Sequence, residues 1–183
     1  YDGHTFTNTA NIDDGGNAQC VAVDSDGTIF LANDSDGLRA YTYNGTSFIN
    51  IAHIDDGNFS QGVALGADGT VFLASGIDGL RAYSYHGTSF TSTAHVQDRG
   101  NAYGVTVGSD GTVFLANDYD GLRAYNYDGA SLTNIASIYD TDYATDVAVG
   151  SDGTVFLANN RDGLRAYSYN GNFFTNTAHI DDG

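Results

Sequence analysis

The stretch "VAVDSDGTIFLANDSDGLRAYTYNGTSFINIAHIDDG", residues Val21 to Gly57, is one unit of a repeat that organises the whole chain. Its hexapeptide "DGLRAY" returns every forty-two residues, without insertion or deletion, starting at Asp36, Asp78, Asp120 and Asp162. Self-similarity at a fixed period indicates structural units that bury their apolar surface against their neighbours. The chain therefore divides into the repeats 16–57, 58–99, 100–141 and 142–183, preceded by residues 1–15.

Short apolar runs, rich in β-branched and aromatic residues and each ended by a turn signal, exclude long helices and predict β-strands. In the first repeat these runs are 21–23, 28–32, 38–43 and about 47–54. Asp-Gly turns separate the first three runs, and Asn44-Gly45, a strong hairpin signal, precedes the fourth. We expect an antiparallel β protein with no helix longer than one turn.

The distribution of apolar residues differs between these strands. The second strand is apolar on both of its faces, with Ile29 and Leu31 on one and Phe30 and Ala32 on the other. The fourth strand is apolar mainly on one face, so it is expected to be partly exposed to water. Four-stranded sheets stacked face to face around an axis produce this gradient. The sequence therefore predicts an all-β protein, a single β-propeller domain over 1–183 with four four-stranded antiparallel blades. Residues 1–15 would form one extra outer strand.

The repeats share variants of one pattern, which is a V-A-V strand, a glycine turn, a "VFLA" strand and "GLR" at the start of the next strand, as in "VAVGSDGTVFLANNRDGLRAY" at Val147 to Tyr167. This pattern resembles the LVIVD-type propeller repeat and, more loosely, the YVTN and NHL propeller families. The resemblance covers essentially the whole chain. It implies a secreted or cell-surface protein of bacterial or archaeal type, so an extracellular or cell-surface location is expected.

The negative side-chain charge of the chain comes from aspartate alone. Six arginines and no lysine or glutamate leave a net charge of −17. A polyanion repels nucleic acid and anionic lipid, so neither is expected as a partner. No apolar run approaches the roughly twenty residues of a membrane span. The single cysteine, Cys20, excludes an intrachain disulfide, and the start at Tyr1 in mid-repeat suggests a processed product or an excerpt.

One arginine recurs in every copy of the hexapeptide. On the predicted third strand, Arg39 shares a face with Tyr41 and Tyr43 and follows Asp36 by three residues. This arrangement favours an ion pair and a cation–π contact that clamp the blades together. A site for an anionic ligand, offered once per blade, is the alternative interpretation. The column consists of Arg39, Arg81, Arg123 and Arg165.

The repeats differ most at the start of their first strands, which should surround the central channel. The side chains expected at this channel rim are Gln19, Cys20, Gln61, Tyr103, Thr145 and Asp146. Near-identical units cannot easily build an asymmetric acid–base pair, and no histidine is paired with a nucleophile in the sequence. A non-catalytic role is therefore favoured over an enzyme.

Acidic loops are the only metal candidates in the sequence. "DSDG" occurs twice in the first repeat and places carboxylate oxygens one residue apart, as calcium loops do. The twelve-residue calcium-loop signature is absent, so solvated turns are favoured and no cofactor is expected. The weak calcium candidates are Asp24, Asp26, Asp34 and Asp36.

Two classes of function remain. The first is a surface-display, binding or adhesion module that engages a glycan or a surface protein, with the channel rim as the site. The second is a structural scaffold that assembles with itself into an oligomer, array or filament. Residues 1–15, "YDGHTFTNTANIDDG", repeat 169–183, "YNGNFFTNTAHIDDG", so two segments compete for one fourth-strand position. Either a larger ring with more blades or strand exchange between molecules explains this surplus.

Overall fold

The computed structural model describes residues 4–139 and 142–181, which form four sheets of four strands each. Blade 1 contains β1 (Cys20–Val23), β2 (Ile29–Ala32), β3 (Leu38–Tyr43) and β4 (Phe48–Ile54). Blade 2 contains β5 (Gly62–Leu65), β6 (Val71–Ala74), β7 (Leu80–Tyr85) and β8 (Phe90–Val96). Blade 3 contains β9 (Gly104–Val107), β10 (Val113–Ala116), β11 (Leu122–Tyr127) and β12 (Leu132–Ile138). Blade 4 contains β13 (Asp146–Val149), β14 (Val155–Ala158), β15 (Leu164–Tyr169) and β16 (Phe174–Ile180).

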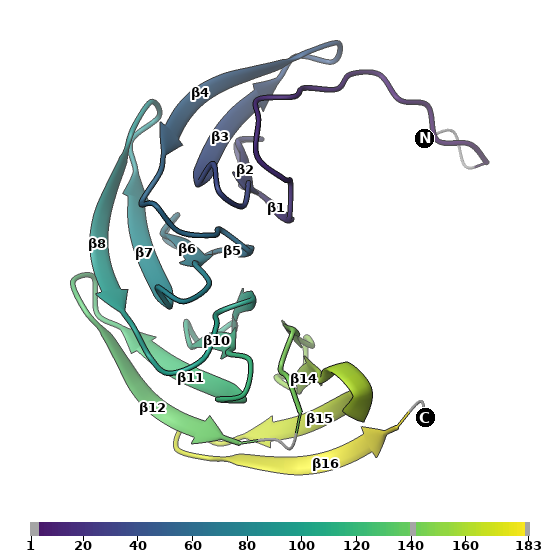
Figure 1. Ribbon diagram of the computed structural model, residues 1–183, viewed down its shortest axis with the longest axis vertical. Helices are drawn as coiled ribbons and strands as arrows, with labels where there is room; N and C mark the ends of the chain where they lie inside the picture. Colours follow the sequence, from purple (N-terminus) through teal and green to yellow (C-terminus); the bar gives the residue numbers. More distant parts are fainter. Residues whose placement is uncertain (1–3, 140–141, 182–183) are drawn as a thin grey trace.

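Every blade is an antiparallel meander whose strands lie in chain order. The blades stand in an arc around one axis, with first strands inside and fourth strands outside (Figure 1). Blades 1 and 4 lie at the two ends of this arc. The predicted propeller fold and its four-stranded blades are confirmed, with strand ends within one residue of those expected in the first repeat. The one helical element among the described residues is a 3-10 turn at Asn160–Asp162. The described part of the chain holds no helix long and apolar enough to span a membrane.

The third and fourth strands of each blade pair with a register shift at the same position. In blade 1 the shift falls between Ala40 and Tyr41, and the other three blades repeat it. A bulge of this kind bends a strand and increases its twist. The outer half of each blade is therefore bent in the same way four times.

The core lies between the blades. In blades 2 and 3, strands β6 and β10 are buried along their whole length, as expected for strands covered on both faces. Each interface is closed by a phenylalanine of one blade that meets a tyrosine of the next edge to face. Phe30 lies 5.1 Å from Tyr85, and Phe72 lies 5.3 Å from Tyr127, between ring centroids. Such aromatic pairs contribute about 0.5–1.5 kcal/mol beyond the area they bury.

The predicted extra strand lies at the end of the arc beside blade 1. Its described residues, 4–15, join none of the four sheets in the described part of the chain. They nevertheless contact blade 1, because Thr9 Oγ1 is hydrogen-bonded to the Tyr43 hydroxyl and Tyr41 donates to Asp14 Oδ2 at 2.8 Å. This segment therefore follows the surface of blade 1 without completing a blade.

Candidate functional site at the propeller axis

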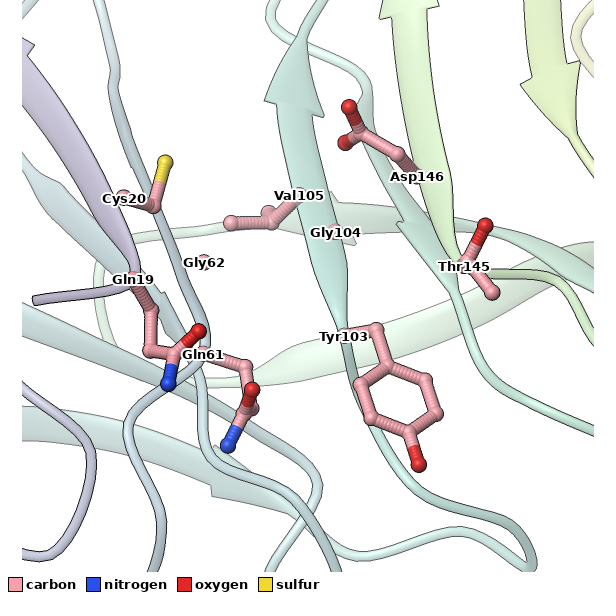
Figure 2. Close-up of a pocket in the computed structure, with 9 residues that line it drawn as sticks. All are labelled: Gln19, Cys20, Gln61, Gly62, Tyr103, Gly104, Val105, Thr145 and Asp146. Carbon is pink, nitrogen blue, oxygen red and sulfur yellow. The ribbon is translucent and has the colours of Figure 1, made fainter. Parts of the chain in front are cut away.

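The first strands of all four blades meet around a pocket of about 270 Å³ at the axis. Its lining includes each of the side chains expected at the channel rim, together with Gly62, Gly104 and Val105. The rim residues are Gln19, Cys20, Gln61, Tyr103, Thr145 and Asp146. Figure 2 shows the amides of Gln19 and Gln61 and the ring of Tyr103 extending to one side. That these residues bind a ligand stays a prediction.

Two glycines allow the first strands to approach each other at the axis. A Cβ atom on Gly62 would lie 2.5 Å from the carbonyl oxygen of Tyr103. A Cβ atom on Gly104 would lie 2.5 Å from Asp146 Oδ1. Because neither distance is compatible with a side chain, the close approach of blades 2, 3 and 4 depends on these glycines. The carboxylate of Asp146 occupies the space that a side chain at position 104 would fill.

The pocket offers mainly neutral hydrogen-bonding groups. Gln19 and Gln61 supply amides that both donate and accept, and Thr145 supplies a hydroxyl. The Thr145 hydroxyl donates to the carbonyl of Ala158 at 3.1 Å, so its oxygen can still accept. Asp146 contributes the one carboxylate of the lining, and its Oδ1 accepts from the backbone N–H of Val147 at 2.9 Å. The Cys20 thiol lies 3.8 Å from the carbonyl of Val63.

Three tyrosines make the side of the pocket near blades 3 and 4 different from the rest. The rings of Tyr119 and Tyr143 lie 4.0 Å apart between centroids, and their hydroxyls are hydrogen-bonded to each other. Burial raises the pKa of Tyr103, and the nearby charges of Asp118 and Tyr143 raise it further. The tyrosines therefore form a polar and aromatic group beside the pocket.

Asp118 is the buried acid of this group. It is 3% exposed, and its Oδ2 accepts from Asn101 Nδ2 at 2.7 Å. Among the described residues its Oδ1 has no hydrogen-bond partner. In blade 1 the corresponding Asp34 Oδ1 accepts from Gln61 Nε2 at 3.4 Å, whereas Thr145 stands at the equivalent place in blade 4. The shorter side chain therefore leaves one buried oxygen of Asp118 unsatisfied.

Sequence reasoning singled out Tyr103 but missed Asp118, Tyr119 and Tyr143. The available signal was deviation from the repeat, since Ser35, Ile77 and Arg161 occupy the positions equivalent to Tyr119. Asn17, Phe59 and Asn101 occupy those equivalent to Tyr143. Both positions lie outside the column at the start of the first strands, because Tyr119 is in the turn between β10 and β11 and Tyr143 is in the connection before β13.

The recurrent arginines lie outside the lining of the axial pocket, and Arg39, Arg81 and Arg123 each lie between two carboxylates. Arg81 Nε donates to Asp78 Oδ2 at 2.5 Å, and its Nη1 lies 3.6 Å from Asp56 Oδ2. Asp56 belongs to the connection between blades 1 and 2, and it also accepts from the Tyr83 hydroxyl. The arginine therefore joins this connection to the third strand of the following blade. Arg39 and Arg123 have equivalent ion pairs.

In blade 4, Arg165 donates to Asp162, and the residue equivalent to Asp56, Asp140, lies outside the described residues. The hydrogen bond from Arg165 lowers the pKa of Asp162, and the same bond from Arg39 lowers that of Asp36. Burial, followed by the hydrogen bond to Asp14, raises the pKa of Tyr41 to about 12. The acidic groups thus remain ionised and the tyrosine remains neutral around a fixed guanidinium.

The calcium candidates lie in two separate turns and already have partners. Asp26 Oδ1 accepts from the backbone N–H of Thr28 at 2.8 Å, and this bond lowers its pKa. Asp24 Oδ1 accepts from its neighbour Ser25, and Asp36 binds Arg39. Asp34 Oδ2 accepts from Asn17 Nδ2 at 2.9 Å. Within residues 4–139 and 142–181, no group of three or more His, Cys or Asp side chains has a geometry suited to a metal ion.

Three histidines repeat the same contact with the arginine-bound aspartates. Nε2 of His53 is hydrogen-bonded to the carbonyl oxygen of Asp36 at 2.7 Å, and His95 has the same contact with Asp78. His179 has the same contact with Asp162 in blade 4. None of the five histidines is among the residues that line the axial pocket. His53, His95 and His179 therefore contact the turn that precedes the third strand of their blades.

No family model matches the sequence, and no curated protein matches it, so the LVIVD-type resemblance stays a prediction. Solved structures do resemble the fold. A protein from Lactobacillus plantarum aligns with a TM-score of 0.79 at 16% identity, over 90% of this chain and 56% of that chain. A protein of unknown function from Bacteroides caccae aligns with a TM-score of 0.70 at 14% identity, over 93% of this chain and 63% of that chain. The chain thus spans less than two thirds of these neighbours, and at such identities the likeness establishes the fold alone.

Proposed function

We propose that this protein is a non-catalytic binding module, displayed outside the cell, whose axial pocket binds a small hydroxyl-rich ligand such as a saccharide. The observation that carries this proposal is the chemistry of the pocket. Its lining combines two amides, a hydroxyl, a phenol and a single carboxylate around about 270 Å³. Amides and hydroxyls can donate and accept at once, which matches the hydroxyl groups of a sugar. A tyrosine adds an apolar ring face on which a pyranose can stack.

The differences between blades at the pocket rim support a binding role. The residues that repeat in every blade, such as Arg81 and Tyr83, are engaged in contacts that hold the blades. The residues at the pocket rim, in contrast, differ between blades, since Gln19, Gln61, Tyr103 and Thr145 are equivalent positions of the four repeats. A ring of equivalent units becomes selective only where the units differ, so the asymmetric side near Tyr103 and Asp146 would orient the ligand. The pocket is close to the lower end of the usual range for ligand sites, about 300–1,000 Å³, which favours a ligand of one or two sugar rings.

The non-catalytic part of the proposal rests on the side chains present. Hydrolysis of a glycoside by the usual route needs two carboxylates on opposite sides of the bond. The pocket lining contains one, Asp146. Cys20 lies in the lining without a histidine beside it to act as a base. The extracellular location rests on the resemblance of the repeats to those of cell-surface propellers.

The test is a titration of the 183-residue protein with a panel of neutral mono- and disaccharides. Isothermal calorimetry and nuclear magnetic resonance monitor the binding. Q61A and Y103A should each weaken binding at least tenfold, about 1.4 kcal/mol. Q97A is the matched control, because Gln97 lies outside the pocket and donates to the carbonyl of Ile77. Circular dichroism should show that all three variants remain folded.

Two results would overturn the proposal. The first is equal affinity of the wild type, Q61A and Y103A, which would place the ligand elsewhere. The second is no detectable binding of any saccharide of the panel at about 10 mM. A sugar with a dissociation constant in the millimolar range would be bound at this concentration. Release of free sugar from the disaccharides during the titration would show instead that the pocket is catalytic.

A further inference from the structure

The two ends of the blade arc expose apolar surface that the internal blades bury. At the end formed by blade 4, Phe156 is 37% exposed and Leu164 is 47% exposed. Their counterparts in blade 3, Phe114 and Leu122, are 3% and 0% exposed because blade 4 covers them. This face of blade 4 is therefore built like a blade interface.

The opposite end of the arc shows the complementary face. Val21 in blade 1 is 60% exposed, whereas its counterparts Val63 and Val105 are 4% and 8% exposed. Val23 is also 60% exposed. In blades 2 and 3 this surface lies against the preceding blade, so blade 1 presents the receiving half of the same interface.

The interfaces between neighbouring blades show which side chains each of the two faces contributes. Phe114 of blade 3 packs edge to face on Tyr169 of blade 4, with ring centroids 5.3 Å apart and an interplanar angle of 90°. Tyr169 in turn lies 5.0 Å from Phe174, tilted by 37°. Blade 1 holds the same receiving pair, because Tyr43 lies 5.0 Å from Phe48 at 35°. The aromatic pair of blade 1 that would receive a phenylalanine, Tyr43 and Phe48, is therefore already formed. Phe156 is the residue of blade 4 that is equivalent to Phe114.

We propose that a second copy of this chain docks head to tail, so that Phe156 of one copy packs on Tyr43 and Phe48 of the other. Three internal interfaces of the same design show that one blade covers another in this way. Each copy carries one half of the interface at each end. In this arrangement a blade of another copy covers both exposed faces, as the neighbouring blade covers the equivalent faces inside the arc.

The segment 6–12 completes this docking as the fourth strand at the junction. Its sequence FTNTANI differs from β16, FTNTAHI, at one of seven positions. Thr9 bonds the Tyr43 hydroxyl as Thr93 of β8 bonds the Tyr127 hydroxyl of the next blade, the latter at 2.6 Å. Residues 6–12 thus already lie where the fourth strand of a preceding blade would lie. In the assembly they pair with β15 of the docked copy in place of β16. Exchange between nearly identical strands costs little, so burial of the apolar faces drives association.

The first experiment measures the mass of the 183-residue chain by sedimentation and light scattering over a concentration series. Association predicts a mass above 19.2 kDa that rises toward twice that value or beyond. Each copy carries a net charge of −17, so salt should strengthen the association by screening repulsion. A mass of 19.2 kDa at every concentration and salt level would overturn the proposal.

Variants test the two faces separately. V21D and F156D should each remain folded by circular dichroism and sediment as monomers. I77D is the matched control, since Ile77 is also 60% exposed but lies on blade 2 away from both ends, and it should associate like the wild type. A mixture of V21D and F156D should form a dimer, because V21D keeps an intact blade 4 face and F156D keeps an intact blade 1 face. Failure of the mixture to associate would overturn the head-to-tail arrangement.

Disulfide trapping tests the exchanged strand in a Cys20→Ala background. Ser168 pairs with Thr175 between β15 and β16, and Thr7 is the residue of the segment that corresponds to Thr175. S168C with T7C should form a disulfide between two copies on oxidation. S168C with T175C is the comparison, and it should form the bond within one chain whenever β16 remains in place. Association of the first double variant without the intermolecular bond would overturn strand exchange.

Discussion

Replacing Arg81 with alanine is the most direct test of the recurrent ion-pair arrangement. The side chain of Arg81 is 17% exposed and that of Asp78 is 14% exposed, so water screens the pair only in part. One hydrogen bond to a charged group contributes about 1.5–3 kcal/mol. R81A would also leave the carboxylates of Asp78 and Asp56 without their shared cation. Removing one partner of a fully buried pair costs about 3–5 kcal/mol, which sets the upper limit here.

We expect R81A to lower the free energy of unfolding by about 2 kcal/mol, because the pair is buried only in part. For a chain of this size each kcal/mol shifts the melting temperature by about 2–4 °C, so the expected decrease is about 4–8 °C. Differential scanning calorimetry and urea unfolding, at matched pH and salt, measure the two quantities. Saccharide binding at the axial pocket should be unchanged, because Arg81 lies outside its lining.

R99A is the control for net charge. Arg99 is an exposed residue of the connection between blades 2 and 3, and its loss takes the net charge from −17 to −18, as the loss of Arg81 does. Exposed substitutions usually change stability by less than about 0.5 kcal/mol. If R81A and R99A melt at the same temperature, the arginine does not clamp the connection. Unchanged melting of R81A together with lost binding would instead indicate a ligand site.

Three further predictions concern the backbone, the pH and the secondary structure. G79A should destabilise the protein by several kcal/mol, because its Cβ would lie 2.3 Å from the carbonyl oxygen of Val96, whereas G87A, with a similar φ of +80° and open space, should lose only about 1 kcal/mol in urea unfolding. Equal losses would show that strain at positive φ, rather than the close approach, decides the cost. Because burial and Asp14 raise the pKa of Tyr41 to about 12, its contribution to stability is complete below pH 10 and is lost as the pH rises from about 10 to 12. Alkaline unfolding should be less steep in Y41F, and an unchanged pH profile would contradict this assignment. Far-ultraviolet circular dichroism should show a β-sheet spectrum, and substantial helical minima would refute the fold.

The strand pattern could be predicted from the sequence because its determinants are local. A strand covered on both faces needs apolar residues at both parities, and the "VFLA" run shows this within four residues. The fixed period of forty-two residues then indicates identical blades stacked on one another. The positions of the channel-rim residues followed from the same periodicity, since equivalent positions in each unit must surround one axis.

Contacts between distant residues were decided only by the tertiary structure. The Tyr83 hydroxyl reaches Asp56 across 27 residues, and the Tyr119 and Tyr143 hydroxyls meet across 24. No local pattern encodes these distances, because they depend on the bend and twist of each blade and on the path of the connections. The exposure of Val21 and Phe156 could not be predicted from the sequence either. The repeats carry equivalent apolar residues at these positions whether or not a neighbouring blade covers them. Sequence thus determined what each blade is made of, and packing alone decided which of its faces are covered.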